Sequence, residues 1–234
     1  MLQSHALTHI GLVRRRNEDA FLDRPEAGLW AVADGMGGHE AGDYASARVV
    51  AALAAATLAP DLDEAAGQVE RQLTAVDGEL RTRAASLGPA AVIATTAVVL
   101  LLRGCRFGCV WAGDSRLYRH RAGELQQMTT DHSQVQEMVD AGLLDRRDAA
   151  FHPAAHIVTQ AIGGGRLAFG RVVGEVMPGD RFLLCSDGLT NMLSDSTIGR
   201  AVGAAPPREA AEGLLAATLA RGARDNVTIV VVAA

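Results

Sequence analysis

Apolar and polar positions alternate along the chain in two ways that predict different elements. Short aliphatic and β-branched runs are bounded by glycine, proline or acidic residues, which is typical of buried strands. Longer alanine-rich stretches without internal proline favour helices. We expect strands at residues 29–33, 95–102, 105–111, 115–119, 169–176, 181–185 and 226–232.

Helices are predicted from composition and from the residues that bound them. Pro89 follows one long alanine-rich stretch and is a helix stop. Ser194 is a suitable N-cap, and a final stretch has proline at its start and Gly222 at its end, the usual asymmetry of a helix. We expect helices at residues 41–58 and 63–87, a partly helical segment at 131–144, and two more that begin at Ser194 and at Pro206.

The order of these segments favours one α+β domain over residues 1–234. Strands between residues 95 and 119 follow one another closely and are expected to form an antiparallel meander. Runs of strands beside grouped helices suggest two antiparallel sheets covered by helices. Residues 145–165 are polar and glycine-rich with little periodicity, so we expect a long, mobile surface loop of the kind that is often functional.

The composition indicates which partners and which cellular compartment are expected for this chain. A net charge of −5 argues against nucleic acid as the main partner, because phosphate backbones require a basic face. Three cysteines do not form a disulfide framework, which indicates a reducing compartment, and Cys105 and Cys109 are expected to face the core from one strand. Residues 1–19 lack the apolar region of a signal peptide, and the longest apolar run, 90–102, is too short to span a membrane. We therefore expect a soluble cytoplasmic protein.

Four aspartates stand at the ends of apolar runs. Three have a glycine beside them, which lets backbone or ligand approach closely. If the strands are neighbours, the carboxylates converge on one sheet edge, where like charges raise one another's pKa and a divalent cation removes that penalty. Oxygen-only ligation favours magnesium or manganese over zinc. A single Asp-Gly pair is a common turn signal, but four strand-end aspartates together indicate a metal site. These residues are Asp34, Asp114, Asp187 and Asp225.

A charged cluster near the N-terminus adds a phosphate-binding feature. Arg14 lies close to the acidic pair Glu18 and Asp19. An acidic pair beside an arginine suits metal ligation and its support, while the arginine grips a phosphate. A phosphoryl substrate fits, because two metal ions about 3.5–4 Å apart can activate a water and clamp the transferring group.

Two histidines have the spacing of a zinc pair on a helix. They are His152 and His156, with Pro153 between them. Because proline disfavours a helix there, we do not expect a zinc site.

The motifs occur in an order that resembles a known family. They are Arg14-x-x-Asn17-Glu18-Asp19, Asp34-Gly35-Met36-Gly37-Gly38-His39, Ala94-Thr95-Thr96-Ala97, Gly113-Asp114-Ser115-Arg116, Asp131-His132-Ser133, Ser186-Asp187-Gly188 and Asp225-Asn226. From Gly11 to Val232 the chain resembles the metal-dependent serine/threonine protein phosphatases of type 2C (the PPM family) in their short bacterial form.

This resemblance implies a four-layer αββα sandwich with metal ions in a cleft at one end. It implies two core ions, Mn²⁺ or Mg²⁺, and places Asp34, Asp187 and Asp225 on one of them. Asp34 would bridge to the second ion, which the carbonyl of Gly35 and, through water, Glu18 would also hold.

The same resemblance assigns further residues. Asp114 resembles the ligand of a third, weaker ion shared with Asp187, and Arg14 resembles the phosphate-binding arginine. Residues 145–165 resemble the flap beside the cleft, where substrate contacts vary. The residues that would support the ligands from beside or behind them are Asp19, Thr96 and Asn226.

Two positions depart from the family pattern. Eukaryotic members have a histidine, thought to be a general acid, where this chain has Met36, so the proton donor is left open; His39 is near in sequence. Ala94 stands where glycine is usual. Residues 23–43 further resemble the phosphatases that accompany type VI secretion systems.

The resemblance implies hydrolysis of phosphoserine or phosphothreonine in proteins by a metal-activated water, without a covalent phosphoenzyme. The expected partners are phosphoprotein substrates and a cognate serine/threonine kinase that the enzyme counteracts; a monomer is expected, with no nucleic acid and no membrane. Two alternatives stay open: a catalytically weak regulatory or binding module of the same fold, and another metal-dependent phosphohydrolase. All four aspartates are retained, which argues against the first, and no histidine precedes them as in histidine-rich nuclease sites, which argues against the second.

Overall fold

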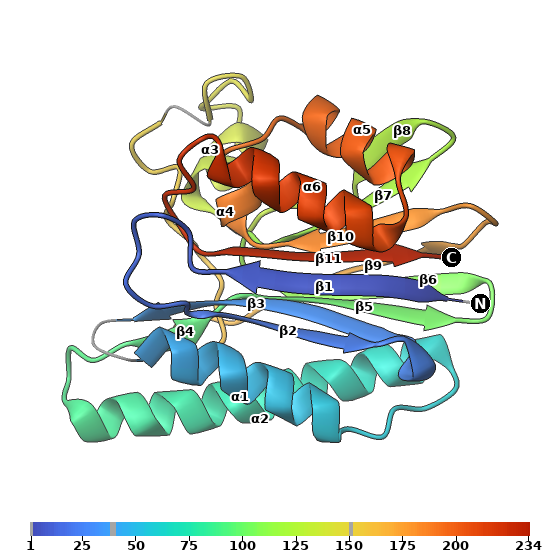
Figure 1. The fold of residues 1–234 in the computed structure, drawn as a ribbon. Helices are drawn as coiled ribbons and strands as arrows, with labels where there is room; N and C mark the ends of the chain where they lie inside the picture. The colour runs from blue at the N-terminus through green and yellow to red at the C-terminus, as the bar shows by residue number, and fades with distance from the viewer. Residues whose placement is uncertain (1, 38–40, 150–151) are drawn as a thin grey trace.

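Two antiparallel sheets pack face to face, and helices cover both outer surfaces (Figure 1). The computed structural model describes residues 2–37, 41–149 and 152–234. Every pairing between the described strands is antiparallel. The expected α+β sandwich of four layers, αββα, is confirmed.

The described strands divide between a five-stranded and a six-stranded sheet. The first has the order β1 (Gln3–His9), β11 (Val227–Ala233), β10 (Arg181–Cys185), β7 (Arg116–Arg121) and β8 (Glu124–Gln127). The second has the order β2 (Asp19–Arg24), β3 (Leu29–Gly37), β5 (Ala97–Arg103), β6 (Arg106–Ala112) and β9 (Gly170–Glu175), with β4 (Ile93–Thr95) paired to β3.

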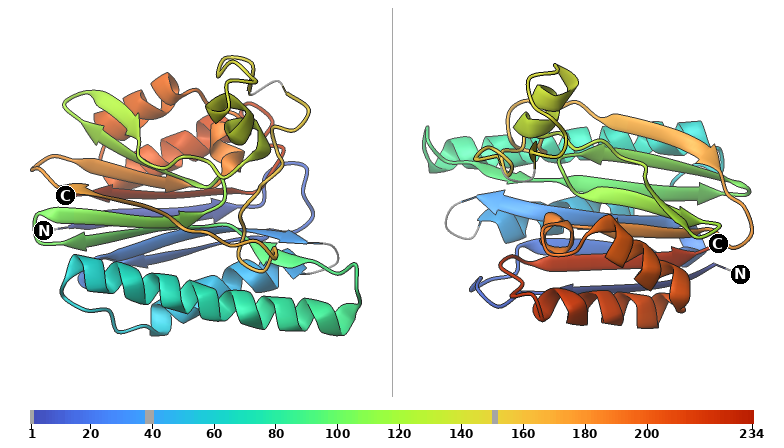
Figure 2. Two further views of the ribbon diagram at one scale, coloured as in Figure 1. Left: turned by 180° about the vertical axis from the view of Figure 1, so that it is seen from behind. Right: turned by 90° about the horizontal axis from the view of Figure 1, so that it is seen from above.

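Helices form the outer layers. The six-stranded sheet is covered by α1 (Ala41–Ala55) and α2 (Leu62–Leu87), whose N-cap Asp61 accepts a hydrogen bond from the Glu64 N–H. The five-stranded sheet is covered by α4 (Asp187–Thr190), α5 (Asp195–Ala204) and α6 (Pro207–Leu219). A short turn of 3₁₀ helix, Pro25–Ala27, joins β2 to β3. Figure 2 shows that α3 (Gln134–Asp140) and the segment after it lie at the same end of the sandwich as the β1–β2 loop.

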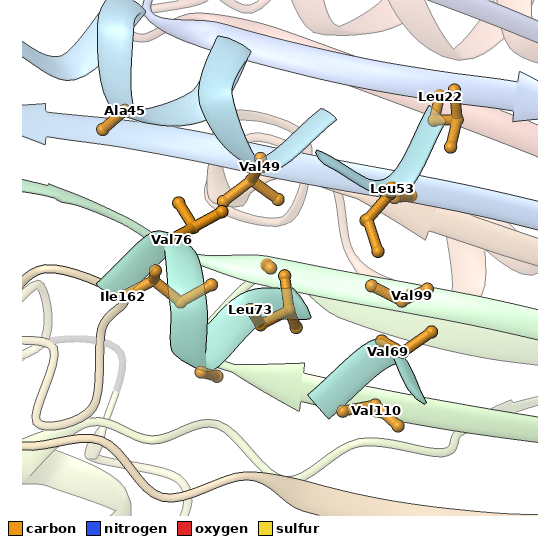
Figure 3. Close-up of a cluster of buried hydrophobic side chains, with 14 of the residues drawn as sticks. Leu22, Ala45, Val49, Leu53, Val69, Leu73, Val76, Val99, Val110 and Ile162 are labelled. Atoms are coloured by element: carbon orange, nitrogen blue, oxygen red, sulfur yellow. The ribbon is translucent and has the colours of Figure 1, made fainter. Parts of the chain in front are cut away.

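Three apolar clusters separate the four layers. Between α1, α2 and the six-stranded sheet, Val49, Leu73 and Val76 pack over Val99 (Figure 3). Between the sheets, the rings of Phe107 and Phe182 lie 5.1 Å apart. The third cluster lies between the five-stranded sheet, α5 and α6.

Burial on both faces explains why the central strands are almost continuously apolar. In β3, Trp30 and Val32 point into the cluster between the sheets, whereas Ala31 and Ala33 point toward α1 and α2. Successive residues of a strand face opposite sides, so a strand covered on both sides needs apolar residues at both parities. The alanines also allow the helices to approach the sheet closely.

Two expectations about the strands were wrong. The run at 29–33 does not stop at Asp34, because β3 continues to Gly37 by pairing with β4. The expected meander is broken after β6, where Gly113, with φ of +111°, turns the chain from one sheet to the other. Strand β7 pairs with β10 and β8 instead of β6.

Other differences concern exposure. Cys109 is buried as expected, but Cys105 is exposed because it lies in the turn between β5 and β6; all three cysteines are free thiols. The edge strands β1 and β2 were not predicted, since their residues are mostly half-buried and mixed in character.

The segment 145–165 docks at its C-terminal end. Gln160, Ala161 and Ile162 are buried, and Ile162 forms a β-bridge with Thr95. The Gly163 N–H donates to the carboxylate of Asp77 on α2 at 2.7 Å. Docking begins earlier than this end, because Ala154 is buried and Val158 forms a β-bridge with Ser133. Among the described residues, the expectation of a surface loop therefore holds for 145–149 but not for the segment as a whole. Separately, within the described ranges, the helices are all too short or too polar to cross a bilayer.

Substitution of two glycines in this segment is expected to destabilise the protein to different extents. Both have positive φ, +86° at Gly163 and +94° at Gly165, a conformation that costs other residues about 1–2 kcal/mol. A Cβ at Gly163 would also collide with the Ile93 carbonyl oxygen and approach the Leu80 side chain to 2.9 Å, whereas no described atom lies within 4 Å at Gly165. We expect Gly163→Ala to reduce the free energy of unfolding by about 3 kcal/mol and Gly165→Ala by about 1 kcal/mol in urea titrations. Equal losses would contradict the docking of this segment.

Candidate metal centre

The four strand-end aspartates meet at one end of the sandwich, and they come from both sheets. Asp34 lies within β3 and Asp114 follows β6, both of the six-stranded sheet. Asp187 opens α4 directly after β10, and Asp225 precedes β11, both of the five-stranded sheet. Convergence therefore occurs between two sheets, which corrects the expectation of a single sheet edge.

Burial and mutual repulsion act on these carboxyl groups together. Burial raises the pKa of Asp34 well above its usual value, and the charges of Asp19 and Asp187 raise it further. The pKa of Asp114 rises to about 7, chiefly through burial and then through Asp187. Burial and the neighbouring Asp225 raise the pKa of Asp187. The cluster is thus an electrostatically unfavourable arrangement that a divalent cation would relieve.

Asp19 lies next to Asp34 on the neighbouring strand, and only one of its two carboxylate oxygens accepts hydrogen bonds from described residues. The β2–β3 register sets Asp19 opposite Asp34. Its Oδ2 accepts hydrogen bonds of 2.7 Å from the hydroxyls of Ser186 and Thr228, while Oδ1 is buried and has no partner among the described residues. Burial raises its pKa to about 6 despite those two hydrogen bonds. An unpartnered buried carboxylate oxygen is costly, and it suits a nearby cation or its water.

Thr96 links two of the aspartates through its hydroxyl. Its Oγ1 accepts from the Asp34 N–H at 3.0 Å and lies 2.8 Å from the hydroxyl of Ser115. The Thr96 N–H donates to the Asp34 carbonyl at 2.9 Å. Since Ser115 follows Asp114, this buried pair of hydroxyls ties the backbone of Asp34 to that of Asp114. Ser115 was not assigned a role from the sequence.

The glycines beside the aspartates allow close backbone packing and are not hairpin turns. A Cβ on Gly35 would collide with the Gly42 carbonyl oxygen and come within 2.6 Å of the Glu18 carbonyl oxygen. A Cβ on Gly42 would come within 2.7 Å of Glu18 Oε1. Gly188 packs equally tightly on the Asn226 carbonyl oxygen. These contacts hold Glu18 beside Gly35.

Asn226 fixes the β1–β2 loop to the start of β11. Its side-chain amide donates to the carbonyls of Ile10 and Arg16 at 2.9 Å each. Its Oδ1 accepts from the Glu18 N–H at 2.8 Å. One side chain therefore anchors both ends of the loop that carries Arg14.

Arg14 pairs with one of the expected metal ligands. Its guanidinium donates to Asp225 Oδ2 at 2.7 Å, with the two side chains 53% and 35% exposed. The hydrogen bond to Asp225 is the main reason that the pKa of Arg14 is raised. An arginine at the mouth of an acidic cluster can receive an anionic group from solvent.

The donor set fits a hard divalent cation, although its side chains are not arranged around one. Within the described ranges, no three acidic, histidine or cysteine side chains form a ready ligand group. Asp225 faces Arg14, and Asp187 accepts a hydrogen bond from the Asn191 amide at 3.0 Å. The carboxylate chemistry and the buried Asp19 oxygen without a partner match Mg²⁺ or Mn²⁺. If Asp225 is a ligand, it would have to exchange Arg14 for the ion.

His132 holds the turn at Gly113, a role that the sequence analysis did not predict. His132 accepts from the Gly113 N–H through Nδ1 at 3.3 Å, and the backbone N–H of His132 donates to the Gly113 carbonyl at 2.9 Å. Its ring stacks on Trp111, with centroids 5.9 Å apart. His132 thus grips the turn that presents Asp114. The motif Asp131-His132-Ser133 marked this position without revealing its role.

Next to it, an ion pair joins β7 to the same loop. Arg116 binds both carboxylate oxygens of Asp131, at 2.9 and 2.6 Å, and donates to the Tyr118 hydroxyl at 3.0 Å. That hydroxyl donates to Asp195 at the start of α5. This largely buried chain ties the Asp114 turn to the helical layer.

The methionine and the histidines named in the sequence analysis lie in different parts of the chain. Met36 is half-buried in β3 opposite Ala94, and His39 lies outside the described residues. His152 accepts from the Ala154 N–H in a turn. His156 acts to lower the pKa of Asp187, against the burial that raises it.

Both the sequence and the fold of the chain are similar to those of known proteins. The profile of the family described as "Protein phosphatase 2C" matches residues 13–221. The serine/threonine protein phosphatase PstP of Mycobacterium tuberculosis is 39% identical over 240 residues, which cover 99% of this chain and 45% of PstP, so the chain spans less than half of that relative.

Solved structures agree over nearly the whole chain. PppA of Pseudomonas aeruginosa, described as a key regulatory component of the T6SS, superposes with a TM-score of 0.92 at 42% identity, over 99% of this chain and 97% of PppA. The catalytic domain of PstP in complex with two manganese ions superposes with a TM-score of 0.87 at 36% identity, over 99% and 97%.

The raised pKa values predict how stability depends on pH without metal. Folded Asp114 keeps its proton up to a pH of about 7, while the unfolded chain releases it near 3.8, so the folded state binds more protons between these values. Stability from this group therefore falls as pH rises through this window. In urea titrations with EDTA, we expect wild type to lose more stability than Asp114→Asn between pH 5 and about 7.5. Parallel pH profiles for the two proteins would contradict the raised pKa of Asp114.

Proposed function

The chain belongs to the protein phosphatase 2C family, and we propose that it hydrolyses phosphoserine and phosphothreonine side chains in proteins. The observation that carries the proposal is the convergence of four crowded carboxylates with Arg14 at their mouth. A cluster of this kind suits cations that in turn attract a phosphoryl group, and the arginine supplies the group that orients it. The names of the relatives support the same activity.

We further propose two core ions, held by Asp34, Asp187 and Asp225, with Asp34 shared between them. The Gly35 carbonyl and, through water, Glu18 would complete the second ion, and Asp114 with Asp187 would hold a weaker third. The two manganese ions of the PstP catalytic domain support the two core positions. When bound, such ions activate a water and neutralise the phosphoryl oxygens.

The chain's own residues bind and orient the substrate around that chemistry. Arg14 is the more exposed partner of its ion pair, so its guanidinium can turn to two phosphoryl oxygens. Asn226 holds the loop of Arg14, while Asp19 and Thr96 hold the acidic cluster. Met36 has no proton to give, so the leaving serine or threonine oxygen must take its proton from another group.

A phosphoprotein substrate implies further proteins that act together with this enzyme. A serine/threonine kinase must supply the phosphorylated protein that this enzyme consumes. The likeness of residues 23–43 to type VI secretion phosphatases, together with the similarity to PppA, supports a regulatory place in that system. We propose one catalytic domain over residues 1–234, with 145–165 as its flap. A monomeric state and a cytoplasmic location stay predictions.

Removal of the metal or of one ligand should abolish turnover. We expect phosphate release from a phosphothreonine peptide to need added Mn²⁺ or Mg²⁺ and to stop in EDTA. Asp187→Asn keeps the shape of the side chain but loses its charge, and it should lower kcat by more than about a hundredfold. Mutating a residue that only supports a metal ligand already lowers metal affinity or activity by about tenfold to a hundredfold. Glu124→Gln, an exposed change on β8, is the control and should leave kcat unchanged. Turnover that survives EDTA would refute metal dependence.

Loss of the arginine should act mainly on substrate binding. Arg14→Ala removes a charge-assisted contact to phosphate, and we expect KM to rise about tenfold to a hundredfold with a smaller change in kcat. The matched control is Arg15→Ala, the next exposed arginine, with KM close to that of wild type. Steady-state kinetics on the same peptide measure both, and an unchanged KM in Arg14→Ala would remove this residue from phosphate binding.

A further inference from the structure

Two large apolar side chains stand in solvent directly before Arg14. Leu12 is 62% exposed and Val13 is 67% exposed. They lie in the loop between β1 and β2. Figures 1 and 2 show this loop at one end of the sandwich, the end from which β11 starts directly after Asp225. A single exposed apolar side chain is ordinary on a protein surface. A leucine and a valine next to each other, directly before Arg14, expose a small apolar surface beside the candidate active site.

The backbone under these side chains is anchored on both sides. The Leu12 N–H donates to the Ala223 carbonyl at 2.9 Å. Gly11 has φ of +81° and packs on the Asp225 carbonyl oxygen so closely that a Cβ would collide with it. Asn226 holds the carbonyls on either side of the loop. These contacts fix the backbone of the loop, so Leu12 and Val13 are held at a defined distance from Asp225 and Arg14.

Folding does not use these two side chains. Neither belongs to the three apolar clusters, although burying a leucine or valine stabilises a protein by about 1.5–3 kcal/mol. The loop keeps its shape through backbone groups and Asn226, so polar residues at these two positions would serve the fold equally well.

We propose that Leu12 and Val13 form a docking surface for apolar side chains that flank the phosphorylated residue of the substrate protein. The inference rests on the proposed function and names the substrate feature that this site recognises. A peptide whose phosphate meets Arg14 must lay its neighbouring residues beside the loop, because successive residues of an extended chain are only about 3.3–3.6 Å apart. Those neighbours would cover the exposed surface of Leu12 and Val13, and apolar ones gain most from doing so.

The test compares three substrates that share the same chemistry. One phosphothreonine peptide carries leucine and valine beside the phosphorylated residue, a second carries serine and glycine there, and para-nitrophenyl phosphate has no flanking residues. For wild type we expect kcat/KM to be higher for the apolar peptide than for the polar one. In the double variant Leu12→Ser/Val13→Ser we expect kcat/KM to fall about tenfold for the apolar peptide and to change less than about twofold for the other two substrates.

A control separates docking from a general effect of exposed apolar groups. Met177 is 48% exposed and lies in the turn before β10, at the end of that strand opposite Asp187. Met177→Ser should leave all three kcat/KM values unchanged, and urea titrations should show that every variant folds as wild type does.

The possible results are distinct. A selective loss on the apolar peptide supports docking. A loss of similar size on all three substrates would overturn it, because the loop would then act only by holding Arg14. Unchanged rates on the apolar peptide, or a wild type that does not prefer it, would overturn it as well. Wild type that cleaves para-nitrophenyl phosphate but neither peptide would refute the proposed function itself, and the docking inference with it.

Discussion

At one end of the sandwich, like charges crowd together in a partly buried cluster, and burial and mutual repulsion raise the pKa of Asp19, Asp34, Asp114 and Asp187. Such a cluster opposes folding unless something compensates for it. The compensation available within the chain is the hydrophobic burial of three apolar clusters, which hold two sheets rigidly enough for their ends to stay side by side. The compensation available from outside is a divalent cation, and the family to which the chain belongs depends on metal ions.

Rigid support of the carboxylates comes from short polar side chains and from glycine. Ser186 and Thr228 hold Asp19, Thr96 holds the backbone of Asp34, and Asn226 holds the loop of Arg14. Gly35 allows backbones from three segments to approach within contact distance, which no larger residue would permit. The exposed Arg14–Asp225 pair is the part of the site that must open, because both partners have proposed roles that exclude their pairing.

Much of this arrangement could be predicted because the central strands are buried on both faces. Continuous apolar runs such as the one around Val32 stand out in a sequence, and the aspartates next to them mark the end of the sandwich where the carboxylates converge. The strands β1 and β2 escaped prediction because half-buried edges carry no continuous run. The exposure of Cys105 and the change of sheet at Gly113 depend on turn geometry. The alternation of residues along a strand carries no information about that geometry. The grip of His132 on Gly113 is a contact between residues 19 positions apart, so only the fold reveals it.

Crystals soaked in Mn²⁺ and measured near the manganese absorption edge would test the central claim most directly, since anomalous scattering locates the ions without reference to activity. The carboxylate cluster predicts two strong peaks between the sheets, in contact with Asp34, Asp187 and Asp225, and an Asp225 side chain that has left Arg14. An intact Arg14–Asp225 pair with no peak at this end of the sandwich would contradict it.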